Sequence, residues 1–109
     1  MYQKILEKAK VTEGDLERKS LFYILANNND LYYKINAIYD FKGGFIRPEC
    51  LEEGTVDFCG SSRSLVKLAF NLFNGYQTEN DDPLNILYNL DEENFEIALK
   101  AIRIRFNRK

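Results

Sequence analysis

The sequence predicts a mainly helical α+β protein, with five to six helices and a small central β-hairpin in a single compact domain over residues 1–109. A chain of 109 residues has the usual length of one domain. Hydrophobic residues make up 45% of the chain and charged residues 29%, which is enough apolar material for one core. Apolar residues recur at helical spacing along most of the chain, whereas glycines and β-prone runs gather only between residues 43 and 60.

The first quarter of the chain predicts two helices. Residues 2–10 place apolar side chains three and four positions apart. Thr12 and Asp15 approximate a capping box, so a second helix is expected from Asp15 to about Ala26. The asparagine tract Asn27–Asn29 then ends it, because asparagine tolerates the left-handed conformation.

The middle of the chain changes from helix to hairpin. Asp30 is expected to cap a helix that runs to the glycine pair Gly43–Gly44. Two short β-prone runs follow, Phe45–Arg47 and Thr55–Phe58, with turn-forming residues between them. We expect these two runs to pair and to pack on the helices, since an isolated hairpin is only marginally stable.

Three more helices are expected after residue 60. The first carries the broadest apolar stripe of the sequence, beginning at Ser61 or Ser62 and ending at Gly75. The dipeptide Asp82–Pro83 predicts the start of a short helix, because aspartate caps and proline favours the first turn. Asp91 is expected to cap the last helix, which has acids in its first turn and arginines at its end.

Composition excludes several classes of protein. The chain has no histidine, which removes imidazole-based catalysis and imidazole metal sites, and no metal or cofactor is expected. Cys50 and Cys59 are too few for a disulfide scaffold or a structural zinc site. No apolar run approaches the length of a membrane span, and the lysine-rich start is unlike a secretory signal. We therefore expect a cytoplasmic protein with reduced thiols.

The segment Cys59–Arg63 is the first candidate site. A strand followed by a helix start would leave free amides facing an anion, and Ser61, Ser62 and Arg63 would add donors. A thiol at Cys59 beside these groups would have a lowered pKa, so a phosphate-binding or thiol-dependent enzyme is one interpretation. The cysteine–arginine spacing is too short for a cysteine-dependent phosphatase, and no P-loop lysine is present. The alternative is an ordinary helix start with a core cysteine.

An acidic stretch is the second candidate. Seven acids and no lysine or arginine fall between residues 76 and 96: Glu79, Asp81, Asp82, Asp91, Glu92, Glu93 and Glu96. Their spacing does not fit an EF-hand, and most have local roles as caps or helix-dipole partners. Asp82 caps a helix, whereas Glu79 and Asp81 have no such local role. Together with Tyr76 these three acids are predicted to contact a partner, and a solvated acidic face is the alternative.

Basic and aromatic residues supply further candidates. The last ten residues carry five positive charges and no acid, and Arg103, Arg105 and Arg108 are the residues expected to contact RNA if the protein binds nucleic acid. Basic residues at a helix end also suit the helix dipole alone. Tyr32 and Tyr33 are adjacent, so one of them is expected to point outward, as interface tyrosines do.

Four phrases of the sequence carry a family resemblance. They are ERKSLFYILANNNDLY from Glu17, IYDFKGGFIRPECL ending at Leu51, VDFCGSSRSLVKLAFNLFNGY from Val56, and DPLNILYNLDEENFEIALKAIRIRF ending at Phe106. In these the chain resembles a family of small uncharacterised proteins of Gram-positive bacteria, their phages and plasmids. The family supplies no catalytic signature. The resemblance implies an accessory gene of a mobile element, a setting in which small acidic proteins inhibit host defence systems such as CRISPR nucleases.

The sequence as a whole predicts a non-catalytic binding protein. Its acidic stretch and basic end are separated along the chain, which favours electrostatic steering toward a charged partner. We expect it to occupy a basic surface of a larger protein or ribonucleoprotein, with no cofactor, metal or membrane partner. An enzyme or anion sensor at Cys59–Arg63 and an RNA-binding protein using the C-terminal arginines are the alternatives, and oligomeric state is left open.

Overall fold

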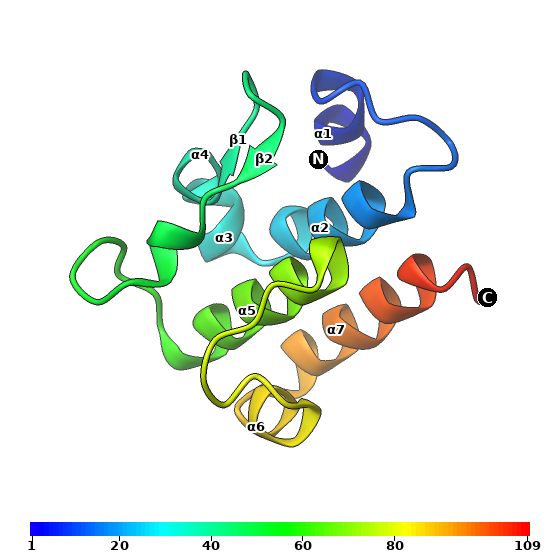
Figure 1. The fold of residues 1–109 in the computed structure, drawn as a ribbon. Helices are drawn as coiled ribbons and strands as arrows, with labels where there is room; N and C mark the ends of the chain where they lie inside the picture. The colour runs from blue at the N-terminus through cyan, green and yellow to red at the C-terminus, as the bar shows by residue number, and fades with distance from the viewer.

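The computed structural model describes residues 1–109 as a helical assembly with one small sheet (Figure 1). In chain order the elements are α1 (Tyr2–Lys8), α2 (Leu16–Asn27), α3 (Asn29–Tyr33), α4 (Ile35–Ile38), β1 (Tyr39–Asp40), β2 (Phe45–Ile46), the 3-10 helix η1 (Pro48–Leu51), α5 (Gly60–Asn74), α6 (Pro83–Tyr88) and α7 (Glu92–Arg105). Seven α-helices therefore replace the five to six expected, while the mainly helical class with a small hairpin is confirmed.

The central helix is α2, which packs on α5 and α7 and also contacts α1 and α3. Its side chains Leu21, Phe22, Ile24 and Leu25 have no exposed surface and form the middle of one hydrophobic cluster. Helix α5 adds Leu65, Val66, Ala69 and Phe70 to the same cluster. Helix α6 lies at one end of the molecule and α1 with the hairpin at the other, while α7 runs from beside α6 toward the end that holds α1 (Figure 1).

Local capping chemistry confirms several predicted boundaries. The side chains of Asp15, Asp82 and Asp91 each accept a hydrogen bond from a backbone amide in the first turn of α2, α6 and α7. Gly75 ends α5 with φ 79°, the left-handed conformation that glycine adopts without a Cβ penalty. Asp82, Asp91 and Gly75 depend only on neighbouring residues, which is why the sequence alone predicts their roles. The capping box expected for α2 is wrong, because Asp15, not Thr12, is the N-cap.

Two further predicted caps are wrong. Asn28, not Asp30, caps α3, because its Oδ1 accepts from the Leu31 amide while Asp30 pairs with Lys34 at 2.8 Å. Helix α5 begins at Gly60, one position before the expected serines, and no side chain caps it. The residues that were expected as caps, Asp30 and the two serines, form other contacts instead.

The central region differs most from the prediction. The helix expected from residue 30 to 43 breaks at Lys34, and its last part becomes the two-residue strand β1 and the turn that follows it. Strand β1 pairs antiparallel with β2, Tyr39 opposite Ile46 and Asp40 opposite Phe45. The predicted pairing of Phe45–Arg47 with Thr55–Phe58 is therefore wrong.

Side-chain hydrogen bonds explain the observed hairpin. Asp40 Oδ1 accepts from the amides of Lys42 and Gly43, both at 2.9 Å, which closes the turn locally. Arg18 in α2 donates to the Tyr39 hydroxyl at 3.1 Å and to the Gly44 carbonyl at 2.8 Å. Residues after Arg47 instead form η1, where the Thr55 hydroxyl donates to the Glu49 carbonyl at 2.9 Å.

No helix combines the length and the apolar composition that a crossing of the membrane requires.

Candidate functional site

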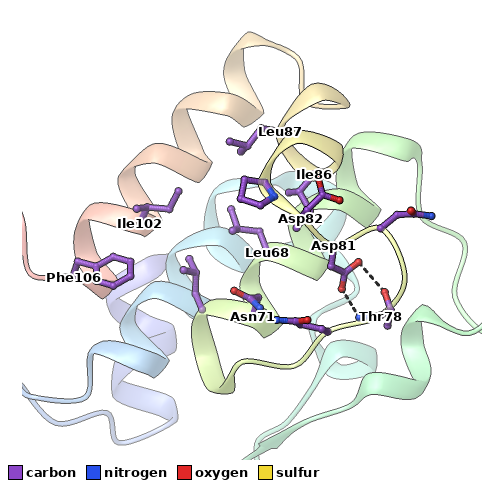
Figure 2. Close-up of a pocket in the computed structure, with 13 residues that line it drawn as sticks. Leu68, Asn71, Thr78, Asp81, Asp82, Ile86, Leu87, Ile102 and Phe106 are labelled. Carbon is purple, nitrogen blue, oxygen red and sulfur yellow. Dashed lines mark hydrogen bonds between the residues drawn. The ribbon is translucent and has the colours of Figure 1, made fainter.

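A groove with a volume of about 650 Å³ lies between α5, α6 and α7. Its apolar lining comes from all three helices: Leu68, Leu72, Pro83, Ile86, Leu87, Ile102 and Phe106. Figure 2 shows Ile102 and Phe106 on one side, Asp81 with Thr78 on the other, and Leu68 between them. The polar lining includes Asn71, Asp81 and Asp82, but no lysine or arginine.

The loop between α5 and α6 forms the polar wall of the groove, and Asp81 holds it in place. The Asp81 carboxylate accepts from the Thr78 amide at 2.6 Å and from the Thr78 hydroxyl at 2.8 Å (Figure 2). It also lies 3.4 Å from Lys67 Nζ, and only 3% of its side chain is exposed. The interpretation of Asp81 as an acid without a structural role is therefore wrong, because tertiary contacts with α5 use it.

The other predicted contact residues differ in how free they are. Asp82 is exposed and caps α6, and hydrogen bonds from Asn85, chiefly from its side chain, hold the pKa of Asp82 below its ordinary value although desolvation opposes this. Glu79 is exposed and forms no ion pair. Tyr76 is half-buried and packs edge-on against Phe70, with 5.9 Å between the ring centroids. Of the four predicted contact residues, Glu79 is thus the one with no interaction of its side chain within the protein.

An apolar stripe on α7 continues the floor of the groove. Phe95, Leu99, Ile102 and Phe106 recur every three or four residues and therefore share one helix face. Phe106 is 61% exposed, and Phe95 and Leu99 are each more than one-third exposed. This face is separate from the one that buries Ile97, Ala98 and Ala101 in the core. Helix α7 therefore has two apolar faces, one that packs in the core and a second that is partly exposed to solvent.

Exposed carboxylates lie beside this apolar surface. Glu92 and Glu96 fall on the helix face next to the stripe, and Asp91 and Glu93 are exposed in the same first turns. None of these four acids forms an ion pair in the structure. With Glu79 and Asp82 near the groove, Glu92 and Glu96 make this end of the protein acidic beside the apolar stripe, whereas Asp91 and Glu93 line a different hollow.

The segment Cys59–Arg63 has its donors engaged within the protein. Arg63 Nη2 donates to the Leu51 carbonyl, and Ser61 Oγ donates to the Asn89 carbonyl at 2.9 Å. Ser62 is buried with its Oγ 3.2 Å from Cys59 Sγ. The hollow beside these residues, which Arg63 does not line, is lined by Asp30, Asp91 and Glu93, a negative setting. Anion binding by Ser61, Ser62 and Arg63 stays a prediction that these contacts do not favour.

The thiol of Cys59 is exposed, and its pKa lies below the ordinary value. The Ser62 hydroxyl is the main cause, followed by the Ser62 backbone amide, since hydrogen bonds to sulfur favour the thiolate. No three Cys, Asp or Glu side chains converge in a way that could hold a metal ion.

Two of the three C-terminal arginines, Arg103 and Arg108, line one hollow, whereas Arg105 lies outside it. Arg105 Nε donates to the Leu72 carbonyl at 2.6 Å, and Arg105 Nη2 lies 3.7 Å from Glu17. Arg103 Nη1 donates to the Lys109 carbonyl at 2.7 Å, and Arg103 and Arg108 line the same hollow beside α1. Nucleic-acid binding by these three residues stays a prediction, with Arg105 used as a structural link between helices.

Comparison with known proteins gives a family but no function. A family model described as a family of unknown function (DUF6075) matches residues 1–109, the whole chain. The chain belongs to this family. None of the curated proteins and none of the solved structures compared with it matches.

The feature of this DUF6075 protein that sequence reasoning missed is the apolar side of the groove. Ile102 and Phe106 line it, although the last helix was interpreted only through its charges. A signal was present, because apolar residues in 92–106 occupy more of the helix circumference than one core-facing stripe needs. Such a surplus indicates either a second buried face or an exposed binding face.

Proposed function

We propose that this protein is a non-catalytic binding protein whose groove between α5, α6 and α7 receives a basic, amphipathic segment of a larger protein or ribonucleoprotein. The observation that carries the proposal is an apolar groove of about 650 Å³ that has the exposed Asp82 and no basic residue in its lining. Hydrophobic side chains of a partner supply affinity in such grooves, and charges at the rim select the partner.

The apolar part of the surface supports a helix as the bound segment. The stripe Phe95–Phe106 runs along α7 for about three turns and is flanked by the exposed acids Glu92 and Glu96. An amphipathic helix presents apolar residues at positions three and four apart, which matches a groove between helices. Lysines or arginines beside those positions would meet the carboxylates.

The acids also support a partner that otherwise binds nucleic acid. Exposed carboxylates compete with phosphate groups for the same lysine and arginine side chains, as in the pairing of guanidinium with either group. The mobile-element setting implied by the resemblance fits inhibition of a CRISPR nuclease as the narrower role. Its test is protection of target DNA from a purified nuclease by the wild-type protein, lost in the Glu79→Lys variant.

The general proposal is tested with a synthetic amphipathic helix of leucine and lysine, about 18 residues long. Its binding is measured by fluorescence anisotropy at two salt concentrations, with a leucine–glutamate peptide of the same pattern as the control. We expect the lysine peptide alone to bind, more weakly at high salt because screening weakens exposed charge pairs. Equal binding of both peptides would contradict the charge selection.

Variants locate the binding surface. Phe106→Ala is expected to weaken binding about tenfold, the usual effect of truncating a well-buried interface aromatic, and Glu79→Lys to slow association. Matched controls are Phe45→Ala, which removes an exposed ring in the hairpin, and Glu52→Lys, which reverses an exposed acid near η1. Loss of binding in Arg103→Glu but not in Glu79→Lys would move recognition to the C-terminal arginines.

A further inference from the structure

A second surface lies at the other end of the molecule, where α1 and α3 meet the chain around the hairpin (Figure 1). A shallow hollow of about 370 Å³ is lined there by apolar residues and by Lys4, Lys8, Tyr32, Tyr33, Asn36 and Phe41. In Figure 1 α1 and the hairpin stand at the top, and α6 lies at the bottom. This surface is therefore separate from the groove between α5, α6 and α7.

The aromatic part of this hollow is open to solvent. Tyr33 is 90% exposed and Tyr32 is 38% exposed, so the expectation that one of the two points outward is confirmed. Neither ring takes part in an aromatic pair, and neither hydroxyl forms a hydrogen bond within the protein. Both rings are thus free to stack on a ligand.

The charge of the hollow is positive, on a protein of net charge −2. Lys4 and Lys8 lie one turn apart on the same face of α1, and neither forms an ion pair. Like charges at this spacing weaken a helix, and no aspartate or glutamate lines the hollow to offset them. Lys8 Nζ lies 4.5 Å from the centroid of the Phe41 ring, which keeps the ammonium beside the aromatic cluster.

We propose that this tyrosine–lysine surface, Lys4, Lys8, Tyr32, Tyr33, Asn36 and Phe41, binds single-stranded nucleic acid. Exposed aromatic rings offer stacking platforms to unpaired bases, and lysines beside them contact the phosphates. The Asn36 amide is exposed in the same hollow and can pair with a base edge. A duplex keeps its bases stacked on one another, so the rings select single strands.

The charge pattern favours nucleic acid over a membrane or an acidic protein. Phe41 is only half-exposed, and the fully exposed ring belongs to a tyrosine, whose hydroxyl opposes insertion into an acyl layer. An acidic protein segment would satisfy Lys4 and Lys8 but would leave two adjacent tyrosine faces without planar partners. Both alternatives are outcomes of the test.

The test uses the full chain and fluorescein-labelled single strands of twelve uridines or twelve thymidines, with binding followed by anisotropy at about 50 and 200 mM salt. We expect dissociation constants of about 10–100 µM at low salt, as for sequence-independent binding. Uridine and thymidine strands share stacking and phosphate contacts, and tighter binding of the uridine strand would assign an additional 2′-hydroxyl contact. A labelled RNA duplex of equal length is expected to bind more weakly.

Variants separate stacking from charge. Tyr33→Ala is expected to weaken binding about tenfold, whereas Tyr33→Phe keeps a stacking ring and should bind like wild type. Lys4→Gln and Lys8→Gln are each expected to lower the slope of affinity against salt by about one. The matched controls are Tyr88→Ala and Lys100→Gln, which change an exposed tyrosine and an exposed lysine on α6 and α7. Thermal unfolding checks that every variant folds.

Three results would overturn the proposal. The first is no binding of either single strand at low salt. The second is binding that Tyr33→Ala and the lysine variants leave unchanged but Arg103→Gln or Arg108→Gln reduces, which would place the contact on α7. The third is Tyr33-dependent binding of vesicles with anionic lipids, or of polyglutamate, without binding of either oligonucleotide.

Discussion

Lys67 Nζ lies 3.4 Å from Asp81 Oδ1, and this ion pair ties the loop between α5 and α6 to the middle of α5. The same carboxylate holds Thr78 through two hydrogen bonds. One acid thus fixes the polar wall of the groove, and the shape of the groove depends on it.

Replacing this acid should loosen the loop. Asp81→Ala leaves Lys67 without its partner and removes both bonds to Thr78, so the free energy of unfolding is expected to fall by about 1–3 kcal/mol. Urea denaturation followed by circular dichroism measures it. Glu79→Ala, which removes an exposed acid from the same loop, should change stability by less than about 0.5 kcal/mol. Equal losses in the two variants would contradict the structural role of Asp81.

Gly75 should resist substitution because of its backbone conformation. At φ 79° an added Cβ is strained even though no atom lies within 4 Å of its position. Gly75→Ala is expected to lower the free energy of unfolding by about 1 kcal/mol. Gly14→Ala is the matched control, because Gly14 has the same open space without a positive φ. A neutral Gly75→Ala would show that α5 ends differently.

Alkaline pH should destabilise the fold. Burial raises the pKa of Cys50 from 9.0 to about 12, and burial together with the nearby Tyr23 raises that of Tyr2 from 10.0 to about 12. The unfolded chain loses these protons at lower pH than the folded chain does, so the free energy of unfolding should fall as pH rises from about 9 to 12. Urea unfolding at several pH values in this window measures the slope. The double variant Cys50→Ala, Tyr2→Phe should flatten it, and an unchanged slope would contradict the assignment.

The two thiols should react at very different rates. Cys59 is exposed with a lowered pKa, while Cys50 is only 1% exposed. Iodoacetamide is expected to label one cysteine in the folded protein and the second only after unfolding, as mass spectrometry can count. In Ser62→Ala the labelling of Cys59 should shift to higher pH, since the main hydrogen bond that lowers its pKa is lost. Ser61→Ala keeps the Ser62 hydroxyl and should shift it less.

The sequence predicts those parts of the fold that depend on neighbouring residues. Asp82, Asp91 and Gly75 act within one turn of their own position, so residue type and spacing suffice to identify them. The hairpin could not be placed in this way. The sequence of strand β1 is compatible with the continuation of the preceding helix. The hairpin is held instead by Arg18 in α2, which donates hydrogen bonds to Tyr39 and Gly44.

Partner contact by the acidic stretch stays a prediction. The charge pattern predicts an exposed acidic region after α5, and all its acids except Asp81 are exposed, because runs of acids without bases remain on the surface. The role of Asp81 depended on Lys67, fourteen positions earlier and on another element, a contact that no local pattern encodes. The apolar floor of the groove likewise comes from three helices that only the tertiary fold brings together.

The central place of α2 has a consequence for how the chain is made. Helix α2 is largely buried, and its main packing partners, α5 and α7, are synthesised after it. On the ribosome the part of its apolar surface that packs on α7 therefore stays uncovered until α7 has left the exit tunnel. During that interval the nascent chain offers this apolar surface of α2 to chaperones, and a pause in translation before residue 92 would prolong the exposure.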